Sequence, residues 1–533
     1  MVDESTLDSD ERRGSGHYLG WVLTGVLLAI IAVALVVALA EPEPPSAAGK
    51  IWTSSRPEEQ GLDASKLDEM LALIDAHDLN IRSIIIVRNG HTVFEHYDRR
   101  YYANSAETIY SVTKSVTSLL VGIALNQGYI PGLETSVCKL LPDYDFSSAD
   151  PRLAQVTLEH LLTMTAGFDW PEHEVSYADP NNITRLMWNS PDPVQFVLDR
   201  PLVHEPGQVW AYNTGASLLL GAIMEEATGR DLVDYADEVL FRPIGIEHVA
   251  WSKGSGGYYD TGGGLRLKPQ EMARLGYLML RDGQWQGRQV VPAAWVSRST
   301  AAHVQANDLY DYGYQWWVQP DGQGFEAQGL YGQQVSVFPA ADMVVTITAV
   351  TEEGTLFHVG GFVHDFILAA CSDLPPRPAI GQYQDHGVTF VYPGDFSLSE
   401  QPFPGREAVS NEAGIVQITS TGGFLETFSL LWSETASDED ERALLDQYLA
   451  YIAESEESFA PGDYGQGIKD GRPMSYRFFT LGAGETTVQA MSGLWICDES
   501  GRLFGATYLS AAAPSADALL ASFDSLVAGV SCP

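Results

Sequence analysis

The sequence predicts an α/β chain of the α+β kind, in which an antiparallel sheet is flanked by helices and carries an inserted helical subdomain. A small C-terminal α+β domain and an N-terminal transmembrane helix complete the prediction. The 533 residues are too many for one hydrophobic core. A helical stripe followed by a hairpin pattern opens the folded part, and alternating, β-rich segments close it after a mostly helical middle.

The composition is that of a folded and strongly acidic protein. Hydrophobic residues make up 45% of the chain and aromatic residues 11%. The 30 Lys and Arg residues are outnumbered by 70 Asp and Glu residues, which gives a formal net charge of −40. Such a charge repels phosphate backbones and anionic lipid surfaces. We therefore expect no nucleic-acid partner.

Residues 18–40 form an uncharged apolar run that exceeds the roughly 20 residues needed to cross a bilayer. Arg12 and Arg13 precede this run and only Lys50 follows soon after it, so the positive-inside rule places residues 1–17 in the cytoplasm. We predict an uncleaved anchor, with a cleaved signal sequence as the alternative. The expected product is a single-pass membrane protein whose part beyond Lys50 is extracytoplasmic.

The four cysteines are compatible with disulfides in an exported compartment. Cys497 and Cys532 share the C-terminal segment and are the predicted bridge. Cys138 and Cys371 are expected to be buried free thiols.

The first folded elements follow a Pro/Ala linker at residues 41–50. The segment 62–77 carries an apolar stripe at helical spacing, and residues 82–97 predict two strands joined at the favoured hairpin dipeptide Asn89-Gly90. Residues 107–280 are expected to be mostly helical with long loops. The alternating segments 313–320, 332–339 and 343–350 predict strands, and residues 353–371 predict a closing helix.

The proline-rich stretch LPPRP marks a boundary, so we expect one domain over residues 51–374 and another over 375–533. The second domain is predicted to contain strands over 387–393, 414–421, 426–433, 474–482 and 502–510, and helices over 438–457 and 515–529.

The chemistry begins at YSVTKS, where Ser111 and Lys114 lie three residues apart at an expected helix start. Residues at this spacing share one helix face, with Cβ atoms about 5–6 Å apart, so the lysine can reach the hydroxyl. The helix N-terminus would also favour negative charge on a reacting oxygen. The alternative is an ordinary helix, because Ser-x-x-Lys occurs by chance in many proteins.

Two further stretches favour the catalytic interpretation. Tyr212 follows a Pro-Gly turn and precedes an apolar helix, and the glycine-rich stretch 327–333 opens a strand. Serine, lysine, tyrosine and a glycine-opened strand in this order resemble the serine β-lactamase and penicillin-binding-protein superfamily, specifically its class C, esterase and 6-aminohexanoate-dimer hydrolase branch. The resemblance covers about residues 51–371 and includes LLTMTAGFDWPE, FRPIGI, GGGLRLKPQEMARLGYLML, YGYQWW and AQGLYGQ. No G-x-S-x-G elbow is present, which disfavours an α/β-hydrolase.

The resemblance implies a β-lactamase-like sheet and a role for each matching position. Ser111 would be the nucleophile, and Lys114 would keep Tyr212 partly phenolate. Tyr212 would take the serine proton and return it to the leaving group. The backbone N–H groups of Ser111 and Leu330 would hold the oxyanion. This chemistry needs no metal and no organic cofactor, and the histidines show no metal-ligand spacing.

Two departures from the family pattern bear on the substrate. The family's second motif is often Tyr-x-Asn, whereas here Tyr212 is followed by Asn213 and Thr214, so both are candidates for substrate binding. Ala327 stands where the family usually has the Lys or His that holds a β-lactam carboxylate, which argues against penicillin hydrolysis. Further candidates for the pocket and its rim are Trp170, Glu172, His173, Gly329 and Tyr331. The glycines at 262–264 are expected to form a tight turn.

The sequence therefore predicts a membrane-anchored serine hydrolase that acts on small-molecule amides or esters. One alternative is a carboxypeptidase or β-lactamase of the penicillin-binding type. The other is a catalytically silent ligand-binding protein on the same scaffold, which a buried amine beside a hydroxyl argues against because of its desolvation cost. The C-terminal domain weakly resembles PsbP-like modules and is expected to be an accessory domain.

Overall fold

The computed structural model describes residues 52–533 with gaps. Not described within this range are 77–78, 248, 308–309, 320–321, 352–362, 375–379, 387, 394–395, 403–408, 411–412, 421–425, 434–444, 447–448, 451–458, 470–471, 484–485, 497–502, 511–518, 521–522, 524–525, 528–529 and 531–533. The predicted anchor at 18–40 and the predicted bridge between Cys497 and Cys532 therefore lie outside the described residues. Within them, no helix combines the length and the apolar character that crossing a membrane requires.

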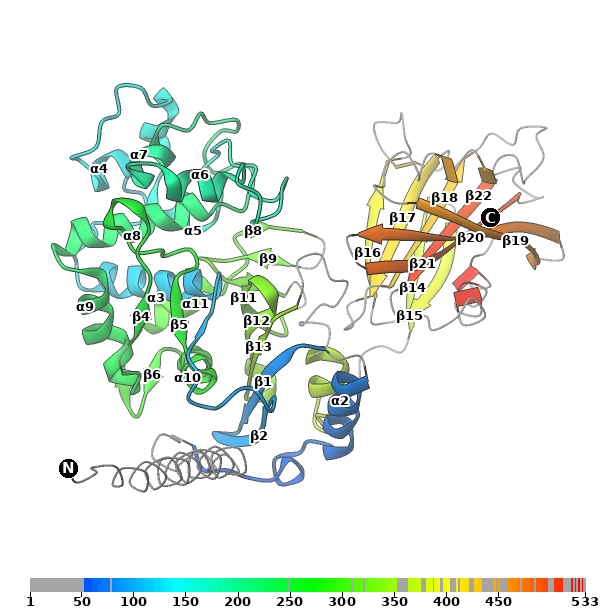
Figure 1. The fold of residues 1–533 in the computed structure, drawn as a ribbon, viewed down its shortest axis with the longest axis horizontal. Helices are drawn as coiled ribbons and strands as arrows, with labels where there is room; N and C mark the ends of the chain where they lie inside the picture. The colour runs from blue at the N-terminus through cyan, green and yellow to red at the C-terminus, as the bar shows by residue number, and fades with distance from the viewer. Residues whose placement is uncertain are drawn as a thin grey trace, which may run out of the picture. The chain divides into compact units, whose positions relative to one another are not determined.

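An eight-stranded antiparallel sheet forms the centre of the region 52–374 (Figure 1). Its strand order is β2-β1-β13-β12-β11-β10-β9-β8. The strands are β1 (Ile81–Arg88), β2 (His91–Tyr97), β8 (Val304–Gln305), β9 (Asp311–Tyr312), β10 (Trp317–Val318), β11 (Phe325–Gly329), β12 (Gln333–Phe338) and β13 (Met343–Ala349). Because β1 pairs with β13, the sheet unites strands from both ends of this region, as predicted.

The hairpin between β1 and β2 turns at Asn89 and Gly90, as predicted. Both residues have positive φ, at 51° and 74°, which is the two-residue turn that fits the twist of the flanking strands. The strands themselves are rich in β-branched residues, and β1 is buried on both faces apart from Arg82. This burial places β1 inside the sheet, between β2 and β13.

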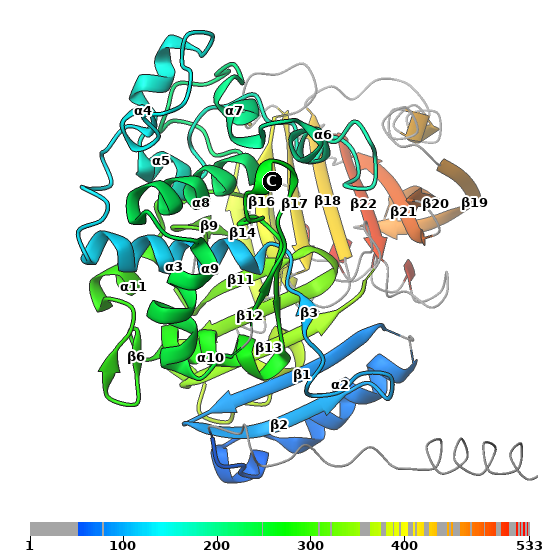
Figure 2. The ribbon, with the colours of Figure 1, turned by 60° about the vertical axis from the view of Figure 1, so that its left-hand side comes forward.

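Helices cover both faces of the sheet (Figure 2). On one face, Ile84, Ile86 and Val345 pack in one cluster with residues of α2 (Ala64–Ala76) and of the short helix Val363–Leu368. The opposite face is covered by α3 (Val112–Asn126) and α10 (Pro269–Leu280). The helix predicted over 62–77 is confirmed. Of the helix predicted over 353–371, residues 353–362 lie outside the described part of the chain, and the described remainder contains the helix Val363–Leu368.

The inserted helical part begins from α3, which packs against α8 (Thr214–Thr228). Both helices are buried along almost their whole length, as expected of helices enclosed by other elements. The other helices of this part are α4 (Val137–Leu140), α5 (Leu158–Leu162), α6 (Ile183–Asn189), α7 (Pro193–Leu198), α9 (Leu232–Ala236) and, after α10, α11 (Ala293–Ser299).

A small sheet joins β3 (Glu107–Thr108), which comes just before α3 in the chain, to β5 (Leu265–Leu267) and β4 (Ala250–Trp251). Its edge continues into the loop that leads to the helix, because the Ile109 N–H donates a hydrogen bond to the Leu265 oxygen at 3.0 Å. This bond ties the start of α3 to the segment that follows residue 260.

The C-terminal part contains a second antiparallel sheet, of seven strands in the order β16-β17-β18-β22-β21-β20-β19, and a hairpin of β14 and β15. The strands are β14 (Ile380–Asp385), β15 (Val388–Pro393), β16 (Phe396–Gln401), β17 (Ala413–Ser420), β18 (Glu426–Ser433), β19 (Phe459–Lys469), β20 (Arg472–Ala483), β21 (Thr486–Ile496) and β22 (Leu503–Ser510). The five predicted strands are confirmed, and β14, β16, β19 and β21 were not predicted. The two hydrophobic clusters of this part contain only its own residues. The domain boundary at 374 remains a prediction.

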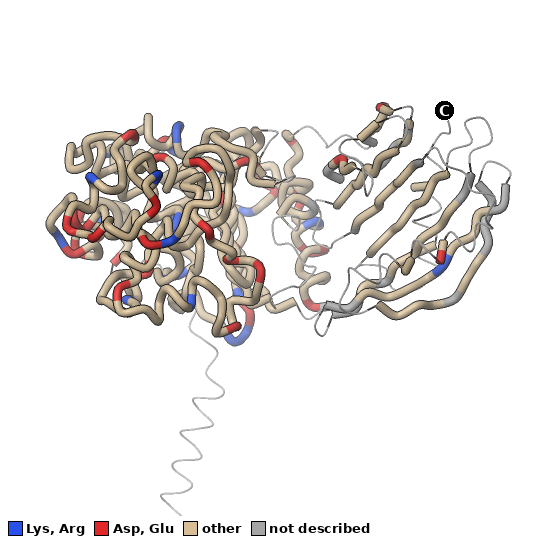
Figure 3. The backbone as a smooth tube through the Cα atoms, turned by 90° about the horizontal axis from the view of Figure 1, so that it is seen from above, with Lys and Arg blue, Asp and Glu red and all other residues tan. Residues whose placement is uncertain are grey.

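Two further sequence features can be followed in the structure. Cys138 and Cys371 are free, as predicted; Cys371 is buried and Cys138 is half-buried. Acidic positions are more widespread along the described backbone than basic ones (Figure 3), in keeping with the net charge of −40.

Candidate active site

Ser111 stands at the start of α3, as predicted, and its side chain forms no capping hydrogen bond with the helix. The residue before it, Tyr110, has a φ of 45°, a conformation that is rare for an aromatic residue. Strain of this kind persists only where surrounding contacts hold the backbone, and it is common at functional sites. The strained turn leaves Ser111 at the first turn of the helix, where backbone N–H groups have no partner inside the helix.

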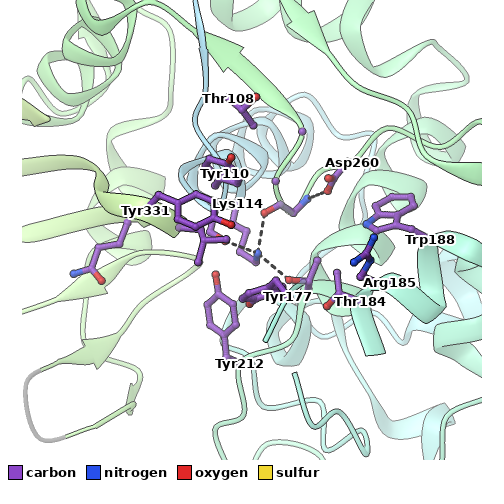
Figure 4. A pocket seen from close by; sticks show the side chains of 18 of the residues that line it. Thr108, Tyr110, Lys114, Tyr177, Thr184, Arg185, Trp188, Tyr212, Asp260 and Tyr331 are labelled. Atoms are coloured by element: carbon purple, nitrogen blue, oxygen red, sulfur yellow. Dashed lines mark hydrogen bonds between the residues drawn. The ribbon is translucent and has the colours of Figure 1, made fainter. Parts of the chain in front are cut away.

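Lys114 lies one turn further along α3 and is 2% exposed. Its Nζ contacts three oxygens, namely Ser111 Oγ at 3.0 Å, Thr214 Oγ1 at 3.0 Å and the Gly262 carbonyl at 2.8 Å (Figure 4). An ammonium has three N–H donors, so these contacts use all of them. The buried charge is therefore fully hydrogen-bonded.

The other hydrogen bonds of these three oxygens determine which of them can donate a proton to Lys114 Nζ in place of accepting one from it. The Gly262 carbonyl can only accept. Thr214 Oγ1 donates its own proton to Glu172 Oε1 at 2.5 Å, so it also accepts from Lys114. Only the Ser111 hydroxyl can instead donate. If Lys114 holds one proton fewer, its lone pair faces Ser111 Oγ, which is the geometry of a base beside a nucleophile.

Glu172 is 2% exposed and accepts four hydrogen bonds. Its Oε1 accepts from the hydroxyls of Thr214 and Tyr177, at 2.5 and 2.7 Å. Its Oε2 accepts from the Thr214 backbone N–H and from Trp170 Nε1, both at 2.7 Å. Both carboxylate oxygens are thereby saturated, and the carboxylate fixes the start of α8 and the direction of the Thr214 hydroxyl.

Tyr212 lies immediately before α8, and the Lys114 Nζ is 4.8 Å from its ring centroid. The ring stacks on Trp317 at 6.1 Å with an interplanar angle of 17°, and His173 lies 5.2 Å from it on the pocket rim. In Figure 4 the Tyr212 hydroxyl points toward Lys114. The structure thus brings the three predicted catalytic side chains together from segments about a hundred residues apart in the chain.

The end of β11 approaches the start of α3 very closely. A Cβ atom on Gly329 would lie 2.4 Å from the Ile109 oxygen and 3.2 Å from the Ser111 nitrogen, so only glycine fits there. Tyr331, two residues later, also has a positive φ, at 63°, and meets Tyr110 edge to face at 5.2 Å. The contact between these two tyrosines, both with positive φ, therefore holds together the two segments that carry Ser111 and Leu330.

The turn after residue 260 supplies the third acceptor for Lys114. Asp260 Oδ1 accepts from the Gly262 N–H at 3.1 Å and so shapes this turn. Burial raises the pKa of the Asp260 carboxyl, and the nearby positive charge of Lys114 opposes the shift. A Cβ on Gly262 would lie 2.6 Å from Thr214 Cγ2, so the turn can hold its carbonyl against Lys114 only with glycine there.

A cavity of about 650 Å³ opens over these groups. Of the predicted site residues it is lined by Ser111, Lys114, His173, Tyr212, Thr214, Gly329, Leu330 and Tyr331. Asn213 and Trp170 are not among its lining residues. Asn213 Oδ1 caps α8 by accepting from the Ala216 N–H at 2.8 Å, and Trp170 is buried behind the wall, where it holds Glu172.

Other lining residues had no assigned role in the sequence. Gly262 belongs to a stretch that was interpreted as a turn alone, Asp260 had no interpretation, and Tyr110 carries no pattern that reveals its strained backbone. Arg185 and Trp188, on α6, also line the cavity. The single signal for these two was their place shortly after the predicted pocket rim at Glu172 and His173.

No cluster suited to a metal lines this cavity among the described residues. The one group of three potential metal ligands found there is formed by Asp385, His386 and Glu400 in the C-terminal part. Acidic side chains often gather on surfaces without an ion.

Residues 82–360 match the family model described as Beta-lactamase. The chain belongs to the beta-lactamase family. It is 23% identical over 288 residues to the 6-aminohexanoate-dimer hydrolase of Paenarthrobacter ureafaciens, a match that covers 49% of this chain and 71% of the relative. It is 23% identical over 260 residues to Penicillin-binding protein 4* of Bacillus subtilis, covering 40% of this chain and 53% of that protein.

A solved structure supports the same fold. The structure named "Putative 6-aminohexanoate-dimer hydrolase from Bacillus anthracis" matches with a TM-score of 0.50 and 22% identity, over 60% of this chain and 86% of that chain. The predicted β-lactamase-like architecture is therefore confirmed. With relatives named as hydrolases, this beta-lactamase family member is assigned to the hydrolases.

Proposed function

We propose that the chain is a membrane-anchored, extracytoplasmic serine hydrolase that cleaves small-molecule amides or esters through an acyl-enzyme on Ser111. The observation that carries this proposal is the buried Lys114 Nζ, 3.0 Å from Ser111 Oγ and hydrogen-bonded to two further acceptors. Burying a cation costs free energy, and this one is held where it contacts a nucleophile. A silent binding protein has no need for that arrangement.

The reaction follows from the positions of the groups. Ser111 loses its proton to the Lys114–Tyr212 pair as Oγ attacks the carbonyl carbon, and the carbonyl oxygen gains negative charge between the Ser111 and Leu330 N–H groups. Tyr212 then gives the proton to the leaving amine or alcohol, which breaks the scissile bond and leaves the acyl group on Ser111. Water attacks this acyl group in the second half-reaction, and the released serine regains a proton.

The third motif favours ordinary amides and esters over penicillins. Ala327 is buried and uncharged, and the neighbouring Gln328 donates from Nε2 to Glu326 Oε2 at 2.9 Å. This segment offers no cation for a β-lactam carboxylate. The relative named as a 6-aminohexanoate-dimer hydrolase fits the same interpretation.

The anchor and the export rest on residues 18–40 and on the arginines before them. A hydrolase held in this way would meet substrates outside the cytoplasm. We expect the protein to act on small molecules, with neither a nucleic acid nor a metal as a partner.

The function is tested by turnover of three substrate classes with the full chain and its Ser111→Ala variant. We expect hydrolysis of a short-chain 4-nitrophenyl ester and of a linear anilide, both lost in the variant, and a much slower reaction with a chromogenic cephalosporin. A preference for the cephalosporin would favour the penicillin-binding alternative. Absence of turnover together with absence of fluorophosphonate labelling would favour the silent scaffold.

A further inference from the structure

Arg185 is a cation in the wall of the pocket that has no carboxylate partner among the described residues. It lies on α6 with its side chain exposed, and Lys114 is the other Lys or Arg among the lining residues. Its Nη1 donates to the Ala178 carbonyl, and its other N–H donors have no hydrogen-bond acceptor within the described part of the chain. By contrast, Arg200 after α7 forms an ion pair with Asp169 at 2.7 Å.

Next to Arg185, a buried hydroxyl lacks a hydrogen-bond partner. The Thr184 Oγ1 atom is buried and forms no hydrogen bond with the described residues, although Thr184 lines the same cavity. A buried polar group without a partner costs free energy, which favours rotation of the Thr184 side chain about χ1 into the cavity, where a ligand oxygen can accept from its hydroxyl. An arginine and a hydroxyl side by side are the donors that a carboxylate accepts from well.

Neither the carboxyl in the pocket wall nor the buried carboxylate behind it neutralises this arginine. Asp260 lines the pocket but accepts from Gly262 and lies beside the Lys114 charge. Glu172 is buried with four donors on its oxygens. The uncompensated positive charge is notable in a chain whose formal net charge is −40.

The position of Arg185 indicates which end of the substrate it meets. In Figure 4, Arg185, Thr184 and Trp188 lie on one side of Lys114, whereas Tyr331 lies on the other side and Tyr212 below. The oxyanion is held beside Leu330 and the leaving group meets Tyr212. The remaining substituent of the scissile carbonyl is the acyl chain, so it is the acyl chain that extends toward α6.

The space between Ser111 and Arg185 suits an aliphatic spacer. Trp188 lines it and is held firmly, because its ring packs where a side chain on Gly254 would stand and its carbonyl accepts from Ser255 Oγ. Tyr177 lines the same side. These aromatic surfaces would cover methylene groups and leave the chain end at the guanidinium.

We propose that the pocket selects acyl chains that end in an anionic group, a carboxylate above all, which binds Arg185 and Thr184. This inference rests on the proposed serine hydrolase function and specifies its substrate class. The reaction is unchanged, since the anion binds without forming or breaking a covalent bond. The selectivity lies in a subsite on α6, away from the third motif.

The test compares two series of 4-nitrophenyl esters. One series consists of the half-esters of adipic, pimelic and suberic acid, and the other of the same molecules with the free carboxylate converted to a methyl ester. These chains are too long for the carboxylate to attack its own ester through a five- or six-membered ring. Rates with Ser111→Ala are subtracted as background.

We expect the full chain to prefer the free acid in kcat/KM at one chain length or more. Arg185→Gln should lower kcat/KM for that acid by about 10- to 100-fold, as loss of a charged hydrogen-bonding partner does. The same variant should change kcat/KM for the methyl ester by less than about 2-fold. Thr184→Val should also lower kcat/KM for the free acid and not for the methyl ester, by a smaller factor than Arg185→Gln. Arg288→Gln, which removes an exposed arginine on β7 (Arg288–Gln289) outside the pocket, is the matched control and should alter neither series.

Several results would overturn the inference. One is a higher kcat/KM for the methyl ester at every chain length. Another is a loss of kcat/KM in Arg185→Gln that is equal for the acids and the methyl esters. The third is a loss of kcat/KM for the acid in Arg288→Gln as large as in Arg185→Gln. In each case hydrolysis itself would persist, so the proposed function would stand. Hydrolysis of neither series by the parent chain would contradict the proposed function and this inference with it.

Discussion

The Thr214 hydroxyl donates to Glu172 Oε1 at 2.5 Å and accepts from Lys114 Nζ at 3.0 Å. The carboxylate therefore determines the direction of the Thr214 proton. Because Thr214 then only accepts from Lys114, the hydrogen bond between Lys114 and Ser111 is the one in which donor and acceptor can exchange. Glu172 touches neither Ser111 nor the reacting atoms in this arrangement. It acts as a positioning residue for the amine.

Glu172→Gln is expected to slow acylation of Ser111 without unfolding the chain. An amide has one acceptor oxygen, so its NH2 group would face donors that the second carboxylate oxygen now satisfies, at a cost of about 1–3 kcal/mol. We expect the rate of fluorophosphonate labelling to fall by about 10- to 100-fold, as this energy implies.

The control for this change is Glu174→Gln, an exposed glutamate two residues away, which should label at the parent rate. Thr214→Val should slow labelling similarly, and the double variant should be little worse than either single one, because coupled groups are not additive. Independent, additive losses would show that Glu172 does not act through Thr214.

Gly262→Ala should weaken the hydrogen bond that Lys114 Nζ donates to the carbonyl of residue 262. The new Cβ would lie 2.6 Å from Thr214 Cγ2, so either the threonine or the carbonyl that accepts from Lys114 must move. Gly263→Ala is the comparison, since its Cβ would meet Asp260 at an ordinary 3.5 Å. We expect a clearly larger loss of labelling rate at 262 than at 263. Equal rates would mean that the Gly262 carbonyl is dispensable.

The proximity of Ser111 to Lys114 could be predicted because it is local, whereas the place of Tyr212 beside them was an expectation from the family resemblance. Ser111 and Lys114 share a face of α3 through helix spacing alone, and Tyr212 precedes an apolar helix with a clear turn signal. The choice between Asn213 and Thr214 was not predictable. It depends on the Glu172 carboxylate, 42 residues away in the chain, which draws Thr214 inward and leaves Asn213 as a cap.

The C-terminal part shows the same limit in its strands. β19 contains Pro461 and several glycines, which are signals of turns, yet the pairing with β20 keeps it extended. Tertiary pairing thus overrides the local pattern. Arg185 was missed for a related reason, because one exposed arginine on a short helix carries no sign of facing a pocket.

Glu326, on β11, should make stability depend on pH. It is fully buried among Tyr310, Gln319, Gln328 and Gln334, and burial raises the pKa of its carboxyl above the usual 4.5, against the effect of those hydrogen bonds. The folded state therefore holds this proton more tightly than the unfolded state. Its contribution to stability is complete below about pH 4.5 and is lost as pH rises through the folded-state pKa.

This prediction is checked by urea unfolding of the parent and Glu326→Gln across the range from pH 4 to 8. The unfolding free energy of the parent, measured relative to the variant, should fall as pH rises. A difference between parent and Glu326→Gln that stays constant with pH would contradict the assignment.

The exported topology is tested by adding protease to intact cells. The part beyond Lys50 should be degraded, because Arg12 and Arg13 keep only the short N-terminus inside. A cytoplasmic marker protein serves as the control for cell integrity. Full protection of the hydrolase part would contradict export.

The central claim is that Ser111 is the nucleophile of a unit completed by Lys114 and Tyr212. The most direct measurement is mass spectrometry of the full chain after reaction with a fluorophosphonate, followed by digestion. We predict one phosphonylated site, on the peptide that contains Ser111, with labelling absent in Ser111→Ala and severely slowed in both Lys114→Ala and Tyr212→Phe. Labelling at another residue, or full hydrolysis of the parent's substrates by Ser111→Ala, would contradict the claim.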